Sequence, residues 1–517
     1  MDKFSYLKQV GKWGVQEIVC PGHSEGNPFI DYEIRGIFKS KNQNVAVDGF
    51  YDGNGIYKVR FMPSFEEEYT FEISGSFSDD TFSGSFTVTA AAKDNHGPVR
   101  TANTYHFAYE DGTPYYPVGT TCYVWNLQSQ DMQERTLRTL KDSAFNKIRF
   151  CIFPKHYDYN FKEPISYPYN GTPCDNSKIT KENFSRYYSD FEGNSWDFKS
   201  FNVEHFRHIE QCIEKLGDLS IEADLILMHP YDRWGFSTMG KAEDDLYIKY
   251  VVARFAAYHN VWWSLANEYD LMPQKSIEDW ERFAGIICEN DPYNHLRSIH
   301  NCKPFYNYSQ PWVTHCCIQR QDLYRSAELV NEWRERYKKP IVLDEIAYEG
   351  NIQHGWGNIS GKELVRRFWE ATCRGGYAGH GETFMHPDDV LWWSHGGELH
   401  GESPQRLKFL YGIISETPGL GLMPANSLWD EVAATVESFD MKAKSANDYY
   451  IYYYSFMRPS FREFYYDDCT KFEVEVIDTW KMTIKKIGTF SGKFRVDLPG
   501  KEYMAIRIRK VKDACFA

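Results

Sequence analysis

The segment VWWSLANE, residues 261–268, joins an apolar run to a polar end that carries Asn267 and Glu268. A short apolar run with a β-branched residue and aromatic residues is typical of a buried strand. Side chains alternate along a strand, so Ser264, Ala266 and Glu268 share one side. The two small residues leave room below the carboxylate. The segment therefore predicts an acidic group at the open end of a buried strand.

Seven further strand-like runs lie between residues 100 and 420, and amphipathic helix-like runs separate several of them. One clear helical pattern covers residues 203–216, where apolar residues recur every three or four positions. Eight such units predict an α/β fold of the (β/α)8 TIM-barrel type, with active residues after the strand carboxyl ends. The predicted strands are residues 115–122, 147–153, 222–229, 261–267, 296–301, 312–318, 340–345 and 377–384.

Both flanks of this region show the alternating polarity and turn signals of all-β domains. We predict an N-terminal Ig-like β-sandwich over residues 1–95, the barrel over 100–420 and a C-terminal β-sandwich over 425–517. An aromatic-rich insertion at 154–200 is too long for an ordinary loop after the second strand. It is either a lid that faces the substrate or a structural insertion with its own small core.

The composition narrows the classes of function and partner. Acidic residues outnumber basic ones by 72 to 58, which argues against a nucleic-acid partner. No stretch approaches the roughly 18 apolar residues that a membrane-spanning helix needs. The 12 cysteines form no CxxC pair, and the first residues lack the apolar core of a signal peptide. We therefore expect a cytoplasmic protein with reduced thiols and no membrane partner, and the possibility of a homo-oligomer stays open.

A second acidic strand end lies at residues 341–345, IVLDE. Ile341, Leu343 and Glu345 share a side, which puts Asp344 on the other. By our count Glu268 follows strand four and Glu345 follows strand seven, and these strands face each other across the barrel mouth. A lone Glu after a strand is usually a helix cap, but two carboxylates across one mouth are what glycoside cleavage needs. The pair favours catalysis.

These positions resemble clan A, the 4/7 superfamily of retaining glycoside hydrolases. The match is to Asn267-Glu268 after strand four and to Glu345 after strand seven. The resemblance implies that Glu268 is the general acid/base, that Glu345 is the nucleophile and that Asn267 binds the sugar 2-hydroxyl. It also implies that Arg149 on strand two supports the nucleophile. An aromatic floor after strand eight is implied for Trp392 and Trp393.

The layout of the whole chain is similar to a group of bacterial glycoside hydrolases of largely unassigned substrate, whose barrels are apiosidase-like. The likeness rests on FYDGNG at 50–55, YPVGTT at 116–121 and the C-terminal β-domain. It carries no substrate over. The His or Tyr that such barrels usually have on strand six is not clear, and His315, Gln319 and Gln321 compete for that role.

Other residues near strand ends are candidates for substrate binding. They are Trp125, His229, His300, Gln319 and Glu382. Glu382 also ends a strand and is the rival of either catalytic Glu. No HExxH or close His/Cys set appears, and carboxylate-based glycoside cleavage needs no metal, so we expect no cofactor and no metal.

The resulting hypothesis is a retaining glycosidase with a carbohydrate substrate, exo-acting on oligosaccharides or small glycosides. One alternative is a non-catalytic carbohydrate-binding or scaffold protein. Another is an inverting or transglycosylating enzyme on the same barrel.

Overall fold

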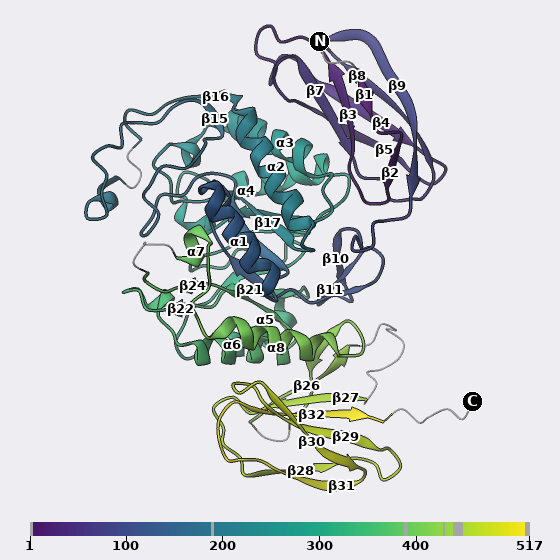
Figure 1. Cartoon of the computed structure of the whole chain (residues 1–517), viewed down its shortest axis with the longest axis vertical. Helices are drawn as coiled ribbons and strands as arrows, with labels where there is room; N and C mark the ends of the chain where they lie inside the picture. The colour runs from purple at the N-terminus through teal and green to yellow at the C-terminus, as the bar shows by residue number, and fades with distance from the viewer. Residues whose placement is uncertain (1–3, 188–190, 387–390, 428–429, 438–447, 512–517) are drawn as a thin grey trace.

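The computed structural model describes residues 4–187, 191–386, 391–427, 430–437 and 448–511. In chain order it shows a β-rich part, a central barrel with helices around it, and a second β-rich part (Figure 1). Every helix within these described ranges is too short or too polar to span a bilayer. All eleven cysteines within them are free thiols.

The barrel consists of eight parallel strands, as predicted. Their order is β19-β18-β17-β14-β13-β23-β21-β20, and an isolated bridge between His300 and Cys317 joins the two ends of that order. The strands are β13 (Gly119–Thr121), β14 (Lys147–Cys151), β17 (Glu222–Met228), β18 (Val261–Ala266), β19 (Arg297–Ser298), β20 (Cys316–Gln319), β21 (Ile341–Glu345) and β23 (Tyr377–His380). β13 begins later than the predicted first strand, because Pro114–Tyr115 pair in a separate small sheet as β12.

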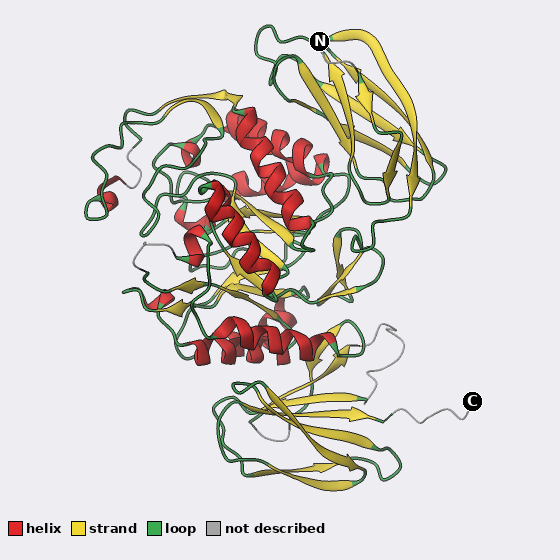
Figure 2. Ribbon diagram, viewed as in Figure 1, coloured by secondary structure: helices red, strands yellow, loops and turns green. Residues whose placement is uncertain are grey.

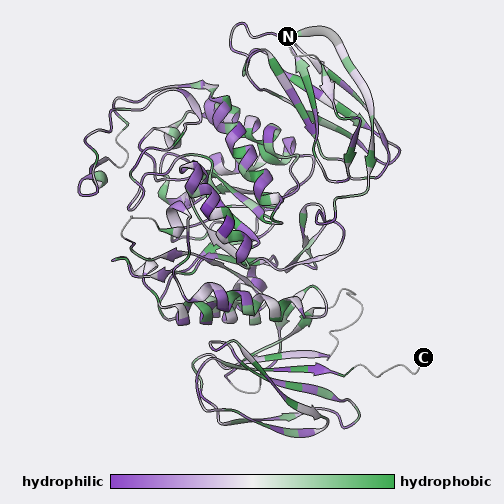
Figure 3. Cartoon of the chain, viewed as in Figure 1, coloured by the Kyte–Doolittle hydropathy of each residue, from purple (hydrophilic) through white to green (hydrophobic). Residues whose placement is uncertain are grey.

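Helices cover the outside of the barrel (Figure 2). They are α1 (Gln130–Asp142), α2 (Val203–Gly217), α3 (Lys241–Phe255), α4 (Ile277–Asn290), α5 (Val330–Tyr337), α6 (Gly361–Cys373) and α8 (Ser403–Ser415), with the short α7 (Trp392–His395) at the mouth. Between β19 and β20, where every residue is described, the chain forms no helix. The local sequence pattern of Ser276 followed three residues later by Asp279 forms a capping box, which begins α4. Hydrophilic and hydrophobic residues are interspersed along these helices (Figure 3). The buried side of α2 carries Phe206, Ile209 and Ile213.

The small sheet β10 (Val99–Ala102), β11 (His106–Tyr109) and β12 covers the amino end of the barrel. Phe107 of this sheet packs on Trp262 near the start of β18, with ring centroids 5.3 Å apart. Because that end is covered, the carboxyl ends of the strands form the mouth. Short pairs border the mouth: β15 (Tyr169–Thr172) with β16 (Ser195–Phe201), and β22 (Glu349–Gly350) with β24 (Glu382–Thr383).

The N-terminal part packs two sheets face to face, with Phe38 and Phe61 stacked between them at 4.2 Å. One sheet has the order β1-β3-β7-β6 and the other β2-β9-β8-β4-β5. The strands are β1 (Ser5–Tyr6), β2 (Gln9–Gly11), β3 (Gln16–Pro21), β4 (Ile34–Lys39), β5 (Asn44–Asp48), β6 (Phe50–Tyr51), β7 (Ile56–Phe61), β8 (Glu68–Gly75) and β9 (Ser78–Thr89).

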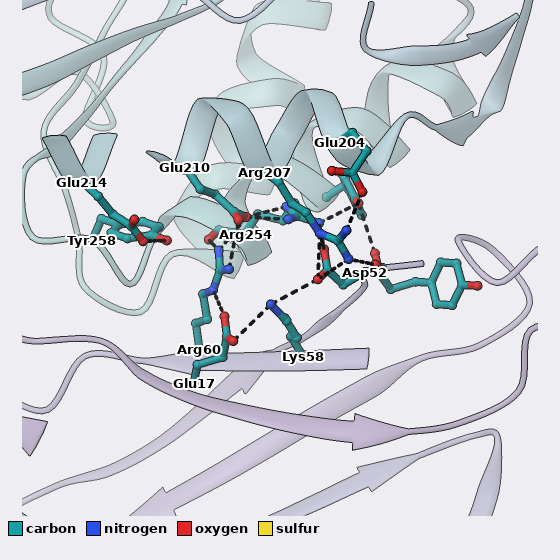
Figure 4. A network of polar contacts seen from close by, with 12 residues as sticks. Glu17, Asp52, Lys58, Arg60, Glu204, Arg207, Glu210, Glu214, Arg254 and Tyr258 are labelled. Atoms are coloured by element: carbon teal, nitrogen blue, oxygen red, sulfur yellow. Dashed lines mark hydrogen bonds and ion pairs between the residues drawn. The ribbon is translucent and has the colours of Figure 1, made fainter. Parts of the chain in front are cut away.

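A network of ion pairs joins this part to the barrel (Figure 4). Arg60 of β7 and Arg254 of α3 both bind Glu210 of α2, at 2.6 Å each. Asp52, which follows β6, binds Arg254 at 2.8 Å. All four residues are buried. Because a buried charge needs its partner, these ion pairs hold the N-terminal part in one position against α2 and α3.

The C-terminal part has a six-stranded sheet, β25-β26-β27-β32-β29-β30, and a facing pair, β28-β31. Trp369 of α6 stacks on Tyr453 of β27 at 5.4 Å and so fixes this sheet against the barrel. The strands are β25 (Gly421–Pro424), β26 (Val432–Glu437), β27 (Tyr449–Tyr453), β28 (Phe461–Tyr465), β29 (Phe472–Asp478), β30 (Thr483–Phe490), β31 (Lys493–Asp497) and β32 (Met504–Lys510).

Candidate active site

Glu268 and Glu345 lie at the same end of the barrel, directly after β18 and at the end of β21. Both are buried, with 6% and 5% of their surface exposed. Glu268 has a left-handed backbone with φ of 51°, a conformation that costs a non-glycine residue about 1–3 kcal/mol and is common at functional sites. Asn267 N–H donates to Met228 O and Tyr269 N–H donates to His300 O, and these bonds hold the turn.

Glu345 is surrounded by donors and positive charge. The hydroxyl of Tyr123 donates to its Oε1. His300 Nε2 lies 3.3 Å and Arg149 Nη1 lies 3.6 Å from the same oxygen, and Gln321 Nε2 donates to Oε2 at 3.4 Å. Burial alone would raise the pKa of Glu345, but His300, Arg149 and Tyr123 outweigh it and lower the pKa to about 2. Glu345 is therefore ionised at neutral pH.

The environment of Glu268 shifts its pKa in the opposite direction to that of Glu345. Its Oε2 accepts a hydrogen bond from the Tyr231 hydroxyl and another from Asn267 Nδ2, at 3.0 Å for the amide. Burial and the negative charge of Glu345 raise the pKa of Glu268 above its usual range. One carboxylate of the pair thus favours the ionised form and the other the protonated form.

Asn267 connects the two carboxylates. Its Oδ1 accepts from Arg149 Nη2 at 3.2 Å and lies 3.0 Å from the hydroxyl of Tyr123, which holds Glu345. Its Nδ2 donates to Glu268. A side-chain amide nitrogen has two donors, so one remains besides the bond to Glu268.

Strict alternation predicted Asp344 on the opposite side of β21 from Glu345, but the structure places both side chains on the same side. It binds Lys147 of β14 at 2.7 Å, and Lys147 also binds Asp224 at 2.7 Å. β14 and β21 are not neighbours in the sheet, so both Asp344–Lys147 and Glu345–Arg149 cross the barrel interior. The ladder between β20 and β21 shifts register before Gln319 and Glu345, and this irregularity breaks the alternation.

Of the predicted aromatic residues, the structure brings Trp393 to the site. Its ring lies 5.5 Å from Tyr123 and 5.9 Å from Tyr157, the first aromatic residue of the insertion. Trp392 lies deeper and donates from Nε1 to Thr120 Oγ1 at 2.8 Å. Trp125 is fully buried against Phe150 and presents no face to a ligand.

The insertion divides its aromatic side chains between two environments. Tyr157 reaches the site, whereas Tyr169 of β15 packs on Phe198, Phe201 and Phe236 at 5.2–5.7 Å. The segment therefore contributes to the mouth, as expected of a lid, whereas its buried aromatic residues join the main hydrophobic core and form no small core of their own.

The three strand-six candidates lie at different places. Gln321 touches Glu345, and Gln319 Oε1 lies 3.1 Å from His300 Nε2, so it orients that ring. His315 lies at the covered end of the barrel between Phe107 and Trp262. The histidine that supports Glu345 is thus His300, which follows β19.

His229 and Glu382 make structural contacts. His229 Nε2 lies 3.3 Å from the carbonyl oxygen of Phe153, and burial lowers the pKa of His229 to about 3. Glu382 accepts hydrogen bonds from the backbone N–H groups of His400 and Gly401, just before α8. Burial raises the pKa of Glu382 to about 7. Its carboxylate is thus used to hold the start of α8.

Sequence reasoning missed three residues of the site: Tyr123, Tyr231 and Lys155. Tyr123 and Tyr231 hold the carboxylates, and Lys155 Nζ lies against their rings. All three follow the carboxyl ends of β13, β14 or β17 by two to four residues. A search for polar aromatic residues and single cations in that window after each strand would have found them.

A cavity of about 660 Å³ opens beside this group. Its lining residue Asp158 follows Tyr157 in the chain and is paired with His354 at 2.7 Å. Segments that follow β13, β14, β21 and β23 form its walls, with Gln128, Asp158, Tyr159, Phe161, Gln353 and His395 among the lining residues. Its volume is in the range of small-molecule pockets. Among the described residues, no group of three or more His, Cys, Asp or Glu is arranged to hold a metal ion.

Comparisons with known proteins agree with this architecture. A protein named as a putative glycoside hydrolase from Bacteroides vulgatus ATCC 8482 is 35% identical, with a TM-score of 0.89 over 98% of this chain and 100% of that chain. A glycoside hydrolase of family 5 from the same organism shares the fold at 16% identity, with a TM-score of 0.58 over 81% of this chain and 96% of that one. No match is found among curated proteins.

The barrel and these relatives define a glycosidase, an enzyme that hydrolyses glycosidic bonds. The model of the family described as "apiosidase-like, catalytic domain" matches residues 101–384, and the chain belongs to that family. Residues 9–76 and 429–509 match two domains of unknown function, DUF5060 and DUF5605.

Proposed function

We propose that the protein is a retaining glycosidase that removes sugar units from the end of oligosaccharides or small glycosides. Glu345 is the nucleophile and Glu268 the general acid/base. The observation that carries this assignment is the contrast between the contacts of the two carboxylates. Tyr123, His300 and Arg149 surround Glu345 and lower its pKa, whereas burial beside the charge of Glu345 raises the pKa of Glu268. Environments that separate the pKa values of two carboxylates in one site define which is the acid.

The two residues act in two steps. Glu345 attacks the anomeric carbon and forms an ester bond, while the bond to the leaving oxygen breaks and that oxygen takes the proton of Glu268. Glu268, now ionised, takes a proton from a water molecule, whose oxygen attacks the same carbon and releases Glu345. Tyr231 and Asn267 can stabilise Glu268 while it is ionised, because both donate to its Oε2.

The exo mode of action is supported by how closed the site is. Both carboxylates are almost fully buried, and the cavity lies on one side of the mouth, where the segments after four neighbouring strands, β14, β13, β23 and β21, form its walls. An enclosed pocket admits the end of a chain and excludes its middle. We assign the cavity to the leaving-group part of the substrate, where Tyr159 can stack on a sugar ring.

The test compares Glu345→Ala with Glu268→Ala on activated aryl glycosides and on unactivated oligosaccharides, first screened with the wild type. Glu345→Ala should lose turnover on every substrate. Glu268→Ala should lose turnover most on poor leaving groups, because an activated aryl group needs little protonation. Azide should then accelerate Glu268→Ala and give a glycosyl azide with the anomeric configuration of the substrate.

Glu382→Gln is the matched control, because Glu382 is also a buried carboxylate after a barrel strand. It should keep turnover per folded molecule. Exchanged behaviour of the two alanine variants would reverse the roles, and loss of activity in Glu382→Gln alone would reject the pair. If nuclear magnetic resonance shows that the first product has the inverted anomeric configuration, the mechanism is inverting.

A further inference from the structure

Lys155 is a buried cation within a group of aromatic rings at the barrel mouth. It is 3% exposed and follows β14. Its Nζ lies 3.5 Å from the ring centroid of Tyr123, 4.3 Å from that of Tyr231 and 4.5 Å from that of Trp393. The ring of Tyr157 is 5.3 Å away. Among the described residues, no carboxylate oxygen lies within 4.0 Å of this amine, so the amine forms no ion pair with them.

Two of these rings are the ones that hold the carboxylate pair. The Tyr123 hydroxyl donates to Glu345, and the Tyr231 hydroxyl donates to Glu268. A single ammonium group therefore touches both phenols at their faces while their hydroxyls touch the two carboxylates. A cation at the face of a phenol attracts the electron density of the ring, and it restricts the ring to one orientation.

We propose that Lys155 is a positioning residue for the carboxylate pair, which holds the rings of Tyr123 and Tyr231 and supplies positive charge to both carboxylates. The proposal rests on the function proposed above for Glu268 and Glu345. It adds a role that an aliphatic side chain of the same length cannot fill, because the contact depends on charge.

The electrostatics of the site agree with this geometry. Burial lowers the pKa of Lys155 to about 8, against the charges of Glu268 and Glu345, which favour the ammonium form. In return the charge of Lys155 lowers the pKa of Glu268. The titratable and charged groups that act on this amine are Cys151, Glu268, Glu345 and Arg149, besides the hydroxyls of Tyr123, Tyr157 and Tyr231, and His229 is in turn affected by it.

The experiment compares Lys155→Met and Lys155→Gln, which are neutral, with Lys155→Arg, which keeps the charge. The neutral variants should lose about 30-fold in kcat, which equals about 2 kcal/mol at 1.36 kcal/mol per tenfold, whereas Lys155→Arg should stay within about threefold of wild type. The alkaline limb of kcat against pH should move to higher pH in the neutral variants, because the pKa of Glu268 rises without the cation. Lys199→Met, an exposed lysine of the same insertion, is the control and should match wild type.

A purely structural role predicts a different outcome. It would lower the melting temperature and the yield of folded protein without moving the alkaline limb, and that result would overturn the proposal. A double-mutant cycle gives a second readout: in a Tyr231→Phe background Lys155→Met should cost about tenfold or less, because part of its effect passes through that phenol. Additive losses would contradict the coupling.

Glu345→Ala, assayed beside these variants, separates this proposal from the one on which it rests. If Glu345→Ala is inactive and the neutral Lys155 variants equal wild type, only the role of Lys155 is wrong. If Glu345→Ala is active, the assignment of the pair is wrong. If Lys155→Met does not fold, Lys155→Gln and Lys155→Arg still test the dependence on charge.

Discussion

Replacing Glu210 with alanine should destabilise the contact between the N-terminal part and the barrel. Its carboxylate accepts from Arg60 at 2.6 and 3.0 Å and from Arg254 at 2.7 Å, and both arginines are buried. Breaking a buried ion pair from one side costs about 3–5 kcal/mol. Arg60 keeps Glu17 and Arg254 keeps Asp52, at 2.8 Å each, so the loss should be at the lower end, about 3 kcal/mol.

The assay is urea and thermal unfolding of the full chain, with turnover measured on the folded fraction. Glu214→Ala is the matched control: it lies one turn along α2, is exposed and accepts one bond from Tyr258 at 3.0 Å. It should cost less than about 1 kcal/mol. Added salt should not rescue Glu210→Ala, because buried pairs are little screened. Equal effects of the two variants, or unchanged stability of Glu210→Ala, would refute the reasoning.

Three further outcomes are expected. Tyr231→Phe removes a hydrogen bond that lowers the pKa of Glu268, so the alkaline limb of kcat/KM should move to higher pH; a limb that stays or falls contradicts the acid role. Tyr159→Ala should raise KM for oligosaccharides about fivefold and leave single-sugar aryl glycosides unchanged, in initial-rate assays; equal effects on both would exclude stacking in the cavity. Burial raises the pKa of Glu382 to about 7, so the stability that this group contributes is full below about 4.5 and is lost as pH rises through 7. The melting temperature of Glu382→Gln should therefore gain on that of wild type between pH 5 and 8, and a constant difference would show that Glu382 does not titrate there.

The sequence predicts those parts of the protein that depend on neighbours along the chain. The eight strand-like runs, the capping box at Ser276 and the Glu residues after β18 and β21 are all local patterns, and the barrel places these two residues at one mouth. Asp344 shows where local patterns fail, because a register shift between β20 and β21 breaks the alternation of side chains. That shift depends on the partner strand and leaves no mark in residues 341–345.

The rest of the site depends on how loops fold over the mouth. Tyr123, Tyr231 and Lys155 come from three different strand ends, and their contacts arise only when those segments converge. The choice among His315, Gln319 and Gln321 likewise could not be made from spacing, since His300 of the neighbouring strand occupies the supporting position beside Glu345.

The barrel closes between β19 and β20 with little backbone pairing, and this affects how the barrel moves. β19 has only two residues, and its extension meets β20 at a single bridge between His300 and Cys317. Side chains replace part of the missing ladder, because Ser298 Oγ accepts from Cys317 N–H and Asn301 Oδ1 accepts from Gln319 N–H. With less backbone pairing than the ladders elsewhere, this seam should exchange its amide hydrogens with solvent sooner than β14, β17 and β18. Because His300 lies on the seam, opening there would widen the mouth on the side of His300 while the pairing of β14, β17 and β18 stays intact.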